Sequence, residues 1–305
     1  MTDPQIAPPA TDQILIFANP IAGRGVGARI ADELEGQFHR EGFRVHKWLK
    51  KPSDLSDEDL DGTARAAIVI GGDGTLRGVA ERLLQAGPVP PLLPVPLGTA
   101  NLMGRHLGIH WKLATVAEQV SRIVNQGKVR QLDAGRANDR LFLLMTGVGF
   151  DAQVVMHLDR LRRGPIQLWH YALPAILSLL ETPGAPLRVI LDGQEIFPEQ
   201  NALAFVGNLA EYGTGFPVVP FARADDGLLD VCVLPCHSHV DLVRLFLLAA
   251  AGEHVQSEGV VYRRGKQIRI ESPRPVPVQV DGDPAGFTPV QIDLLPVRLP
   301  FMVPT

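Results

Sequence analysis

The chain has 305 residues, of which 46% are apolar and 20% are charged, and its formal net charge is −4. This length exceeds one ordinary hydrophobic core and this composition excludes a disordered or collagen-like chain, so we expect a globular protein of two domains. The negative charge argues against a broad nucleic-acid footprint, and the longest apolar stretch, Leu242–Gly252, is far shorter than the roughly 20 residues that span a bilayer.

The first thirteen residues carry two acids, three prolines and no basic run. They do not resemble a signal peptide, and we expect a cytoplasmic protein. The two cysteines, Cys232 and Cys236, lack the second pair that a four-ligand zinc site needs. Both are expected to be packed thiols.

In the first half of the chain, short apolar runs alternate with helical segments. Strand–helix alternation of this kind is typical of a parallel sheet covered by helices, and ligands bind such sheets at the carboxyl ends of the strands. We predict a three-layer α/β domain over residues 13–132. Its expected elements are a strand at Ile14–Ala18, a helix from about Ala28 to Glu41, strands at Phe43–Trp48 and Ala66–Ile70, a helix from Leu76 and a strand at Leu92–Pro96.

After about Leu132 the pattern changes to apolar runs bounded by Gly, Pro, Asn and Asp, which is typical of antiparallel strands. We predict a β-sandwich over residues 133–305 and leave open a return of its last strand to the first domain. Strands are expected at Arg140–Met145, Leu187–Leu191 before Asp192-Gly193, Ala202–Val206, Leu228–Leu234, Gln267–Glu271 and Val276–Val280. Helices are expected at Ile166–Glu181 and at Ser238–Gly252, which has a Ser N-cap and a terminal Gly.

The strand Ala66–Ile70 runs directly into Gly71-Gly72-Asp73-Gly74-Thr75 and then into a helix. Glycines permit positive φ and the approach of phosphate oxygens to backbone N–H groups, and the helix N-terminus adds partial positive charge. Asp73 is suited to hold a Mg²⁺ that the phosphate carries, and Thr75 can donate to an oxygen. The alternative is a glycine turn in which Asp73 is the helix N-cap.

Two further glycine-containing loops follow predicted strands. They are Asn19-Pro20-Ile21-Ala22-Gly23-Arg24-Gly25 and Pro96-Leu97-Gly98-Thr99-Ala100-Asn101. The three loops, in this order and at these spacings, resemble the nucleotide-binding half of the diacylglycerol kinase catalytic family, which includes sphingosine kinases and bacterial lipid kinases. Four later motifs extend the resemblance over nearly the whole chain: Gly147-Val148-Gly149-Phe150-Asp151-Ala152, Tyr212-Gly213-Thr214-Gly215 followed by Pro220, Asp225-Asp226-Gly227-Leu228-Leu229-Asp230 and Val280-Asp281-Gly282-Asp283.

The resemblance implies an ATP- and Mg²⁺-dependent lipid kinase with a nucleotide domain, a lipid-binding sandwich and a cleft between them. The acceptor would be a hydroxyl of diacylglycerol or a related glycerolipid, reached in transient contact with a membrane surface, and a homodimer is left open. The implied nucleotide-binding residues are Asn19, Pro20, Ile21, Ala22 and Gly23, then Gly71, Gly72, Asp73, Gly74, Thr75, Leu76, Arg77 and Gly78, and finally Gly98, Thr99 and Asn101.

The resemblance assigns the proton acceptor to Asp283, with Asp281 as the alternative and Asp73 acting through Mg²⁺. The family has Glu where Asp283 stands, and the missing methylene shortens the reach by roughly 1–1.5 Å. Asp281-Gly282 is also the strongest short signal for a β-hairpin turn, and both interpretations can hold.

The resemblance further implies a structural Mg²⁺ at Arg223–Leu228, held by the Asp226 side chain and the Arg223 and Leu228 carbonyls. Oxygen-only ligands suit this ion. The alternative is a polar turn before the following strand.

Departures from the family pattern predict weaker metal binding or a different proton acceptor. Gly78 and Leu102 stand where the family often has acids, and a Thr expected near the adenine is absent from Trp48-Leu49-Lys50.

Other functions remain open. A sphingoid-base kinase is the nearest alternative. NAD kinase shares the GGDG loop but lacks the later motifs. A dinucleotide-binding oxidoreductase would need an acid at the end of the second strand. A lipid-binding protein without turnover is a further alternative, suggested by Gly78 and Leu102.

Overall fold

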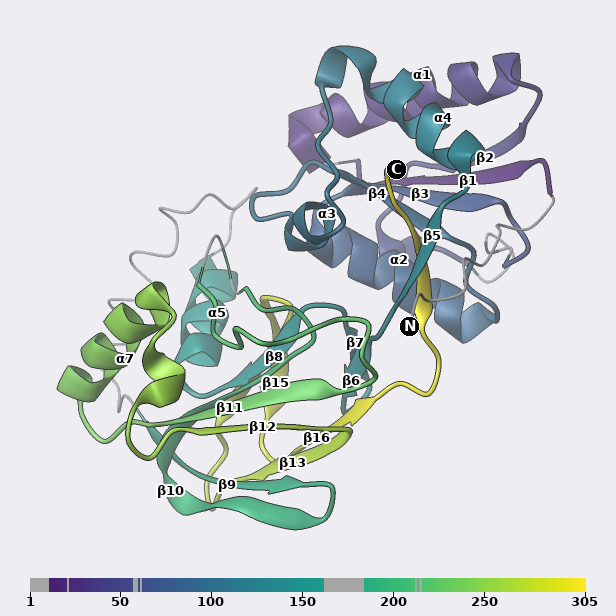
Figure 1. Ribbon diagram of the computed structural model, residues 1–305. Coiled ribbons are helices and arrows are strands. Elements are labelled where there is room, and N and C mark those ends of the chain that lie inside the picture. The colour runs from purple at the N-terminus through teal and green to yellow at the C-terminus, as the bar shows by residue number, and fades with distance from the viewer. Residues whose placement is uncertain are drawn as a thin grey trace. The chain divides into compact units, whose positions relative to one another are not determined.

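The computed structural model describes residues 11–20, 22–56, 60, 62–161, 184–211, 213 and 216–305. The chain divides into two compact units. The first comprises Met1–Leu132 and Arg298–Thr305, and the second comprises Asp133–Val297. Figure 1 shows their elements. The predicted helix Ile166–Glu181 lies outside the described residues, as do Tyr212, Thr214 and Gly215 of one family motif.

In the described part of the first unit, a six-stranded sheet is formed by β1 (Gln13–Ala18), β2 (Arg44–Trp48), β3 (Ala66–Gly71), β4 (Leu92–Pro96), β5 (Val129–Leu132) and β17 (Leu299–Met302). The strand order is β2-β1-β3-β4-β17-β5. The first five strands in this order are parallel to one another. The sixth, β5, pairs antiparallel with β17. A strand from the end of the chain therefore completes the N-terminal sheet.

Helices cover both faces of this sheet (Figure 1). One face carries α1 (Val26–Arg40) and α4 (Val116–Gln126), and the other carries α2 (Asp73–Ala86) and the short α3 (Leu102–His106). In α1, Ile30, Leu34 and Phe38 recur at the helical period and are fully buried. In the described part of this unit, 3-10 turns lie at η1 (Ala22–Gly25), η2 (Pro52–Asp54) and η4 (Leu113–Thr115). The predicted three-layer α/β arrangement is confirmed.

The second unit is predominantly antiparallel. Its described strands are β6 (Gly135–Ala137), β7 (Arg140–Phe142), β8 (Met145–Val148), β9 (Ala185–Leu191), β10 (Gln194–Gly207), β11 (Leu229–Pro235), β12 (Val261–Gly265), β13 (Gln267–Glu271), β14 (Pro277–Val280), β15 (Asp283–Phe287) and β16 (Val290–Leu294). The long strand β10 pairs with β9 along its first part. Along its last part it lies between β8 and β11 and pairs with both. Register shifts between Glu195 and Gln200 interrupt the regular pairing of β10 with β9.

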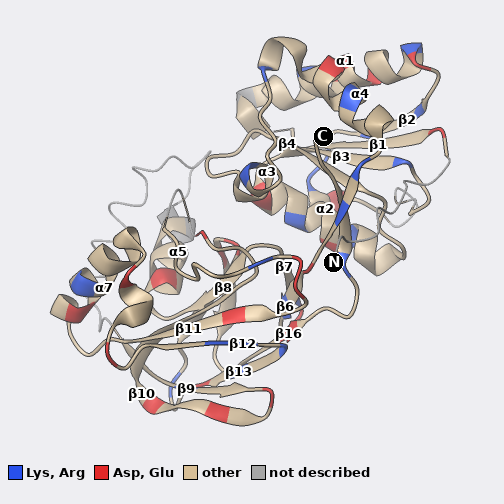
Figure 2. Ribbon diagram, viewed as in Figure 1, with Lys and Arg blue, Asp and Glu red and all other residues tan. Residues whose placement is uncertain are grey.

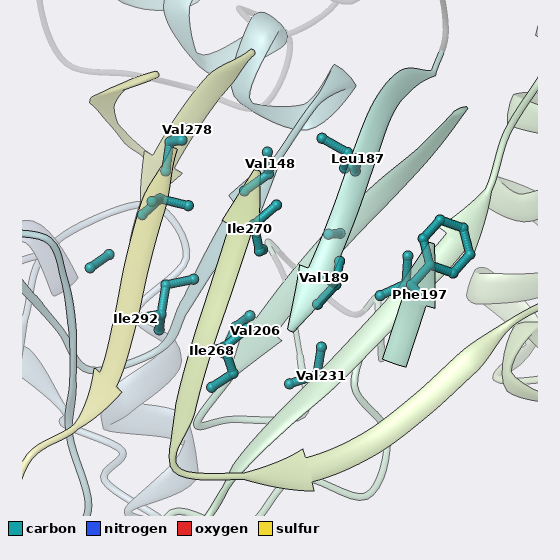
Figure 3. Packing of buried hydrophobic residues seen from close by; sticks show 14 of the residues in the cluster. Val148, Leu187, Val189, Phe197, Val206, Val231, Ile268, Ile270, Val278 and Ile292 are labelled. Atoms are coloured by element: carbon teal, nitrogen blue, oxygen red, sulfur yellow. The ribbon is translucent and has the colours of Figure 1, made fainter. Parts of the chain in front are cut away.

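The inward faces of these strands form one apolar core. Figure 3 shows Val148, Val206, Ile268 and Ile292 among side chains that converge between the strands. Because residues at every second position of each strand point inward, this packing confirms the predicted β-sandwich.

Among its described residues, the second unit has the helices α5 (Phe150–Leu161) and α7 (His239–Ala251) and the 3-10 turn η6 (His254–Gln256). The expected caps of α7 are present: Ser238 accepts a hydrogen bond from the Asp241 N–H, and Gly252 ends the helix at φ 74°. Cys232 and Cys236 are buried and unbridged, as expected for packed thiols.

Three predicted elements had wrong bounds. The run Arg140–Met145 is two strands, β7 and β8, because the chain breaks where Leu143 and Leu144 donate their N–H groups to a side chain. The helix expected from Leu76 begins at Asp73, and the strand Ala202–Val206 is the end of β10. Helices α3, α4 and α5 and strands β5, β6, β12, β15 and β16 were not predicted.

Candidate functional site

The three glycine-containing loops of the first unit lie at one edge of its sheet. They follow β1, β3 and β4, which are adjacent and parallel, so their carboxyl ends meet. The Asn19 side chain donates from Nδ2 to Thr75 Oγ1 at 3.3 Å. The Leu97 N–H donates to the Gly71 carbonyl at 2.8 Å. The structure thus joins the three predicted loops directly.

Two glycines let the second and third loops touch through their backbones. A Cβ at Gly98 would lie 2.7 Å from the Gly72 Cα and 2.9 Å from Asn101 Oδ1, and a Cβ at Gly72 would lie 3.2 Å from the Gly98 Cα. Asn101 closes the third loop, because it accepts the Gly98 N–H at 2.9 Å and donates to the Gly98 carbonyl at 2.8 Å. The glycines are therefore required by the close approach of the two loops.

The N-terminus of α2 supplies the hydrogen-bond donors of this edge. Gly72 is the N-cap, no side chain caps the helix, and Gly74 is exposed. The first N–H groups of a helix lack intrahelical acceptors and carry the positive end of the helix dipole. This arrangement can bind an anion such as a phosphate.

The Asp73 carboxylate contacts α3 and does not act as the N-cap of its own helix, α2. Its carboxylate accepts the N–H groups of Leu102 at 3.0 Å and Met103 at 3.1 Å, and so caps α3 rather than α2. Burial raises the pKa of Asp73 above its ordinary value, while these two amides and the Asn101 amide lower it. The alternative in which Asp73 is the N-cap of its own helix is wrong, because Gly72 holds that position.

The remaining predicted nucleotide residues lie on or next to these loops. Gly23 adopts φ 58°, which favours glycine. Ile21 lies outside the described residues, and Pro20, Thr99 and Gly98 are exposed. Leu76 is buried in α2, where Arg77 follows it.

Gly78 faces a neighbour that explains the absent acid. A Cβ at Gly78 would lie 2.7 Å from Cβ and 2.9 Å from Cγ of Pro52 in η2. Pro52 thus occupies the volume that a side chain at residue 78 would need. Leu102, the other residue that stands where the family often has an acid, is buried, with 7% of its surface exposed.

In the second unit, Asp281 and Gly282 form a two-residue hairpin loop between β14 and β15. Their φ values are 49° and 83°, and Val280 pairs with Asp283. Positive φ at both loop positions is the signature of a type I′ turn, so the hairpin interpretation of this motif is confirmed. Asp283 begins β15 and is partly exposed.

The Asp281 carboxylate performs a structural task. It accepts the N–H groups of Leu143 at 2.9 Å, Leu144 at 2.9 Å and Met145 at 3.0 Å. The second Asp-Gly hairpin is built alike: Asp192 accepts the N–H groups of Lys266 and Gln267. Three backbone amides thus engage the Asp281 carboxylate in holding the segment of residues 143–145.

In the loop Arg223–Leu228, the Asp226 side chain contacts a backbone amide and an arginine. Asp226 accepts the Leu228 N–H at 3.1 Å and pairs with the Arg264 guanidinium at 3.5 Å, with a side chain 19% exposed. Arg264 thus supplies positive charge to Asp226 in this arrangement, and the Mg²⁺ site expected at this loop stays a prediction. Within the described residues, no group of three or more His, Cys, Asp or Glu could hold a metal ion, and no helix is long and apolar enough to cross a membrane.

Two family models match the chain. Residues 13–137 match the diacylglycerol kinase catalytic domain, and residues 145–303 match the YegS C-terminal NAD kinase beta sandwich-like domain. A Mycobacterium tuberculosis (strain CDC 1551 / Oshkosh) protein named diacylglycerol kinase is 30% identical over 302 residues, covering 96% of this chain and 95% of that protein.

Solved structures agree on the fold. The crystal structure of a candidate diacylglycerol kinase from Bacillus anthracis str. Sterne has a TM-score of 0.77 at 23% identity, covering 100% of this chain and 98% of that one. An NAD kinase from Archaeoglobus fulgidus, solved in complex with ATP, has a TM-score of 0.52 at 14% identity, covering 95% and 92%. At these identities the likeness concerns the fold.

Proposed function

Because the chain belongs to the diacylglycerol kinase family, we propose that it transfers the γ-phosphoryl group of ATP to a lipid hydroxyl, of diacylglycerol or a related glycerolipid. The observation that carries this proposal is the joined edge of the first unit, where Gly72 and Gly98 bring two loops into backbone contact beside the open N-terminus of α2. Phosphoryl transfer needs positioning and charge stabilisation more than covalent chemistry, and this edge offers both.

The nucleotide phosphates are proposed to bind at that edge. The first amides of α2 are proposed to face the phosphate, and the exposed Gly74 leaves the backbone of the second loop accessible. Asn19 and Thr75 hold the first and second loops in register through their hydrogen bond.

Magnesium is proposed to enter with the nucleotide. Asp73 is the carboxylate on the phosphate loop, and Gly78 and Leu102 offer no others. Mg²⁺ is commonly held by one or two carboxylates together with substrate phosphates, where it neutralises the charge on the transferred group. Asp73 is 3.0–3.1 Å from two amides, so it would orient such an ion from a fixed position.

In the transfer step, the lipid hydroxyl oxygen attacks the γ-phosphorus while the bond from that phosphorus to the bridging oxygen breaks and ADP leaves. The hydroxyl proton goes to a carboxylate, for which we propose Asp283. Asp281 is unsuited to this role because three amides occupy it.

Transient contact with a membrane surface is proposed for α7. Its inner face buries Leu242, Leu245 and Ala249, whereas four apolar side chains on the other face, Val240, Val243, Phe246 and Leu247, are between 55% and 76% exposed. Such a patch spans on the order of a few hundred Å², less than the roughly 800 Å² per partner of a stable dimer, and suits shallow insertion into a lipid interface. Figure 2 shows that α7 also carries charged positions.

Vesicle sedimentation tests this contact. We expect Val243→Glu to reduce binding to phosphatidylcholine and phosphatidylglycerol vesicles several-fold, and Val297→Glu, which alters another exposed valine of the second unit, to leave it unchanged. Equal binding of both variants would refute the role of α7, and a concentration-dependent mass abolished by Val243→Glu would assign the patch to a dimer.

The activity is tested with Mg²⁺ and γ-labelled ATP against diacylglycerol, monoacylglycerol, sphingosine and NAD. We expect label in a glycerolipid, loss of labelling with Asp73→Ala, and retention with Asp139→Asn, which changes an exposed turn. Label in sphingosine or in NAD would identify the corresponding kinase instead. No labelled acceptor would indicate a binding protein without turnover.

A further inference from the structure

A buried pair of side chains supports the hairpin that carries Asp283. Asp151, in the first turn of α5, is 9% exposed, and its Oδ2 accepts a hydrogen bond from Gln279 Nε2 at 3.1 Å. Gln279 is fully buried in β14, and its Oε1 accepts the N–H of Gly282 at 2.8 Å. Asp151 is thus linked through one side chain to the residue that precedes Asp283.

The neighbouring residues leave space for this pair and form hydrogen bonds with it. A Cβ at Gly147 would lie 1.9 Å from Asp151 Oδ2 and 2.8 Å from Gln279 Nε2, so only glycine leaves room for the contact. The carbonyl of Gln279 accepts Thr146 Oγ1 at 3.0 Å. Burial raises the pKa of Asp151 to about 7, although Gln279 and the first amides of α5 lower it. Enclosing this carboxylate is costly for the fold, which suggests a task beyond packing.

The hairpin is held at both loop residues. Asp281 donates its N–H to the Met145 carbonyl at 2.9 Å, and its carboxylate accepts three amides from residues 143–145. Gly282 is held by Gln279. With both loop residues fixed, the backbone at Asp283 has little freedom to shift.

We propose that Asp151 and Gln279 are positioning residues for Asp283, and that they set the place of its carboxylate through the N–H of Gly282. The proposal rests on the proposed function, in which Asp283 accepts the hydroxyl proton. A side chain one methylene shorter than Glu must be placed by its backbone, and a misplacement of about 1 Å can lower a rate roughly 100-fold. The simpler interpretation is that the pair only holds α5 against β14.

The first measurement is independent of catalysis. Hydrogen exchange of the Gly282 amide is followed in the full chain by NMR or by mass spectrometry of peptides across residues 278–285. We expect Gln279→Leu to accelerate this exchange about 10-fold or more, because the amide loses its acceptor. Gln291→Leu is the control: it removes a partly buried amide that donates to Asp293 and leaves the hairpin contacts intact. Unchanged exchange in Gln279→Leu would overturn the proposal whether or not the protein is a kinase.

The second measurement is steady-state kinetics with ATP and diacylglycerol in mixed micelles. Gln279→Leu and Asp151→Ala should lower kcat about 10- to 100-fold with the KM for ATP within about 2-fold. Asp151→Asn retains an oxygen acceptor for Gln279 Nε2 and should recover most of the rate. In an Asp283→Asn background, Gln279→Leu should lower the residual rate no further.

Each result decides between positioning and packing. An effect of Gln279→Leu that multiplies with that of Asp283→Asn would show that the pair does not act through Asp283. A kcat that is unchanged despite faster exchange would do the same. Failure of the wild-type protein to phosphorylate any lipid would instead refute the proposed function, and the exchange result would still stand.

Discussion

A methyl group on residue 98 has no room, since the nearest atoms are the Cα of Gly72 and a side chain that closes its own loop. We predict that Gly98→Ala separates the two loops and weakens ATP binding at least 10-fold, because overpacking against backbone costs about 1–3 kcal/mol. Isothermal titration calorimetry measures the affinity.

Gly36→Ala in α1 is the matched control for this variant. Its Cβ would meet only the far end of Arg40 at 3.5 Å. It should leave ATP affinity unchanged and raise stability slightly, because alanine favours helix. Equal ATP affinity of Gly98→Ala and wild type would remove the loop contact from the nucleotide site.

Asp151 makes stability depend on pH. Its pKa is raised from 3.8 to about 7 by burial, so the folded chain holds this proton more tightly than the unfolded chain. The resulting stabilisation is present below about pH 4 and is lost as pH rises through about 7. We predict that Asp151→Asn, which does not titrate, gains up to about 4 kcal/mol relative to wild type between pH 4 and pH 8.

Thermal unfolding at pH 5 and pH 8 checks this prediction, with the larger gain in Tm for Asp151→Asn at pH 8. Asp139→Asn, an exposed carboxylate in the turn after β6, should shift Tm equally at both values. A gain for Asp151→Asn that is larger at pH 5 would contradict the burial argument.

At the scale of elements, η2 and α2 are fitted to each other through Pro52 and Gly78. Gly78→Ala should normally stabilise a helix interior by about 1 kcal/mol, but here the new Cβ would lie 2.7 Å from Pro52 Cβ. We predict that Gly78→Ala destabilises the wild-type chain by about 1–3 kcal/mol and stabilises a Pro52→Gly chain. Equilibrium urea unfolding of the four proteins gives the coupling.

This fit has a consequence for the departure from the family pattern. An acid at residue 78 cannot be restored alone, because Pro52 must first be removed. If the effects of the two substitutions on the free energy of unfolding were additive, η2 would have moved to make room for the Cβ without strain.

At the scale of the whole molecule, local patterns and long-range contacts differ in how far sequence predicts them. The parallel sheet and the Asp281-Gly282 hairpin were predictable because strand–helix alternation and Asp-Gly have local causes. The glycine loops could be found by their motifs, and adjacent parallel strands predict that they meet. That Asp73 caps α3, and that Gln279 joins Asp151 to Gly282, could not be read from periodicity, since each contact joins residues far apart in the chain.

The final strand also depends on long-range pairing. β17 inserts between β4 and β5, with Phe301 fully buried, although the second unit precedes it in sequence. We predict that Phe301→Ala, at a typical loss of about 3–5 kcal/mol, mainly lowers the hydrogen-exchange protection of β1, β3 and β4 in the first unit. Exchange mass spectrometry of the full chain measures this loss strand by strand.

Ile268→Ala is the matched control, because Ile268 is equally buried but belongs to the core of the second unit. It should lower protection mainly in its own strand, β13, and in the two strands that pair with it, β9 and β16. Each substitution removes a buried side chain from a strand that lies between two other strands of its sheet. The two variants therefore differ chiefly in the unit that they affect. Equal loss across both units in either variant would mean that the C-terminal strand stabilises one cooperative structure, and the first unit would then have no separate stability to lose.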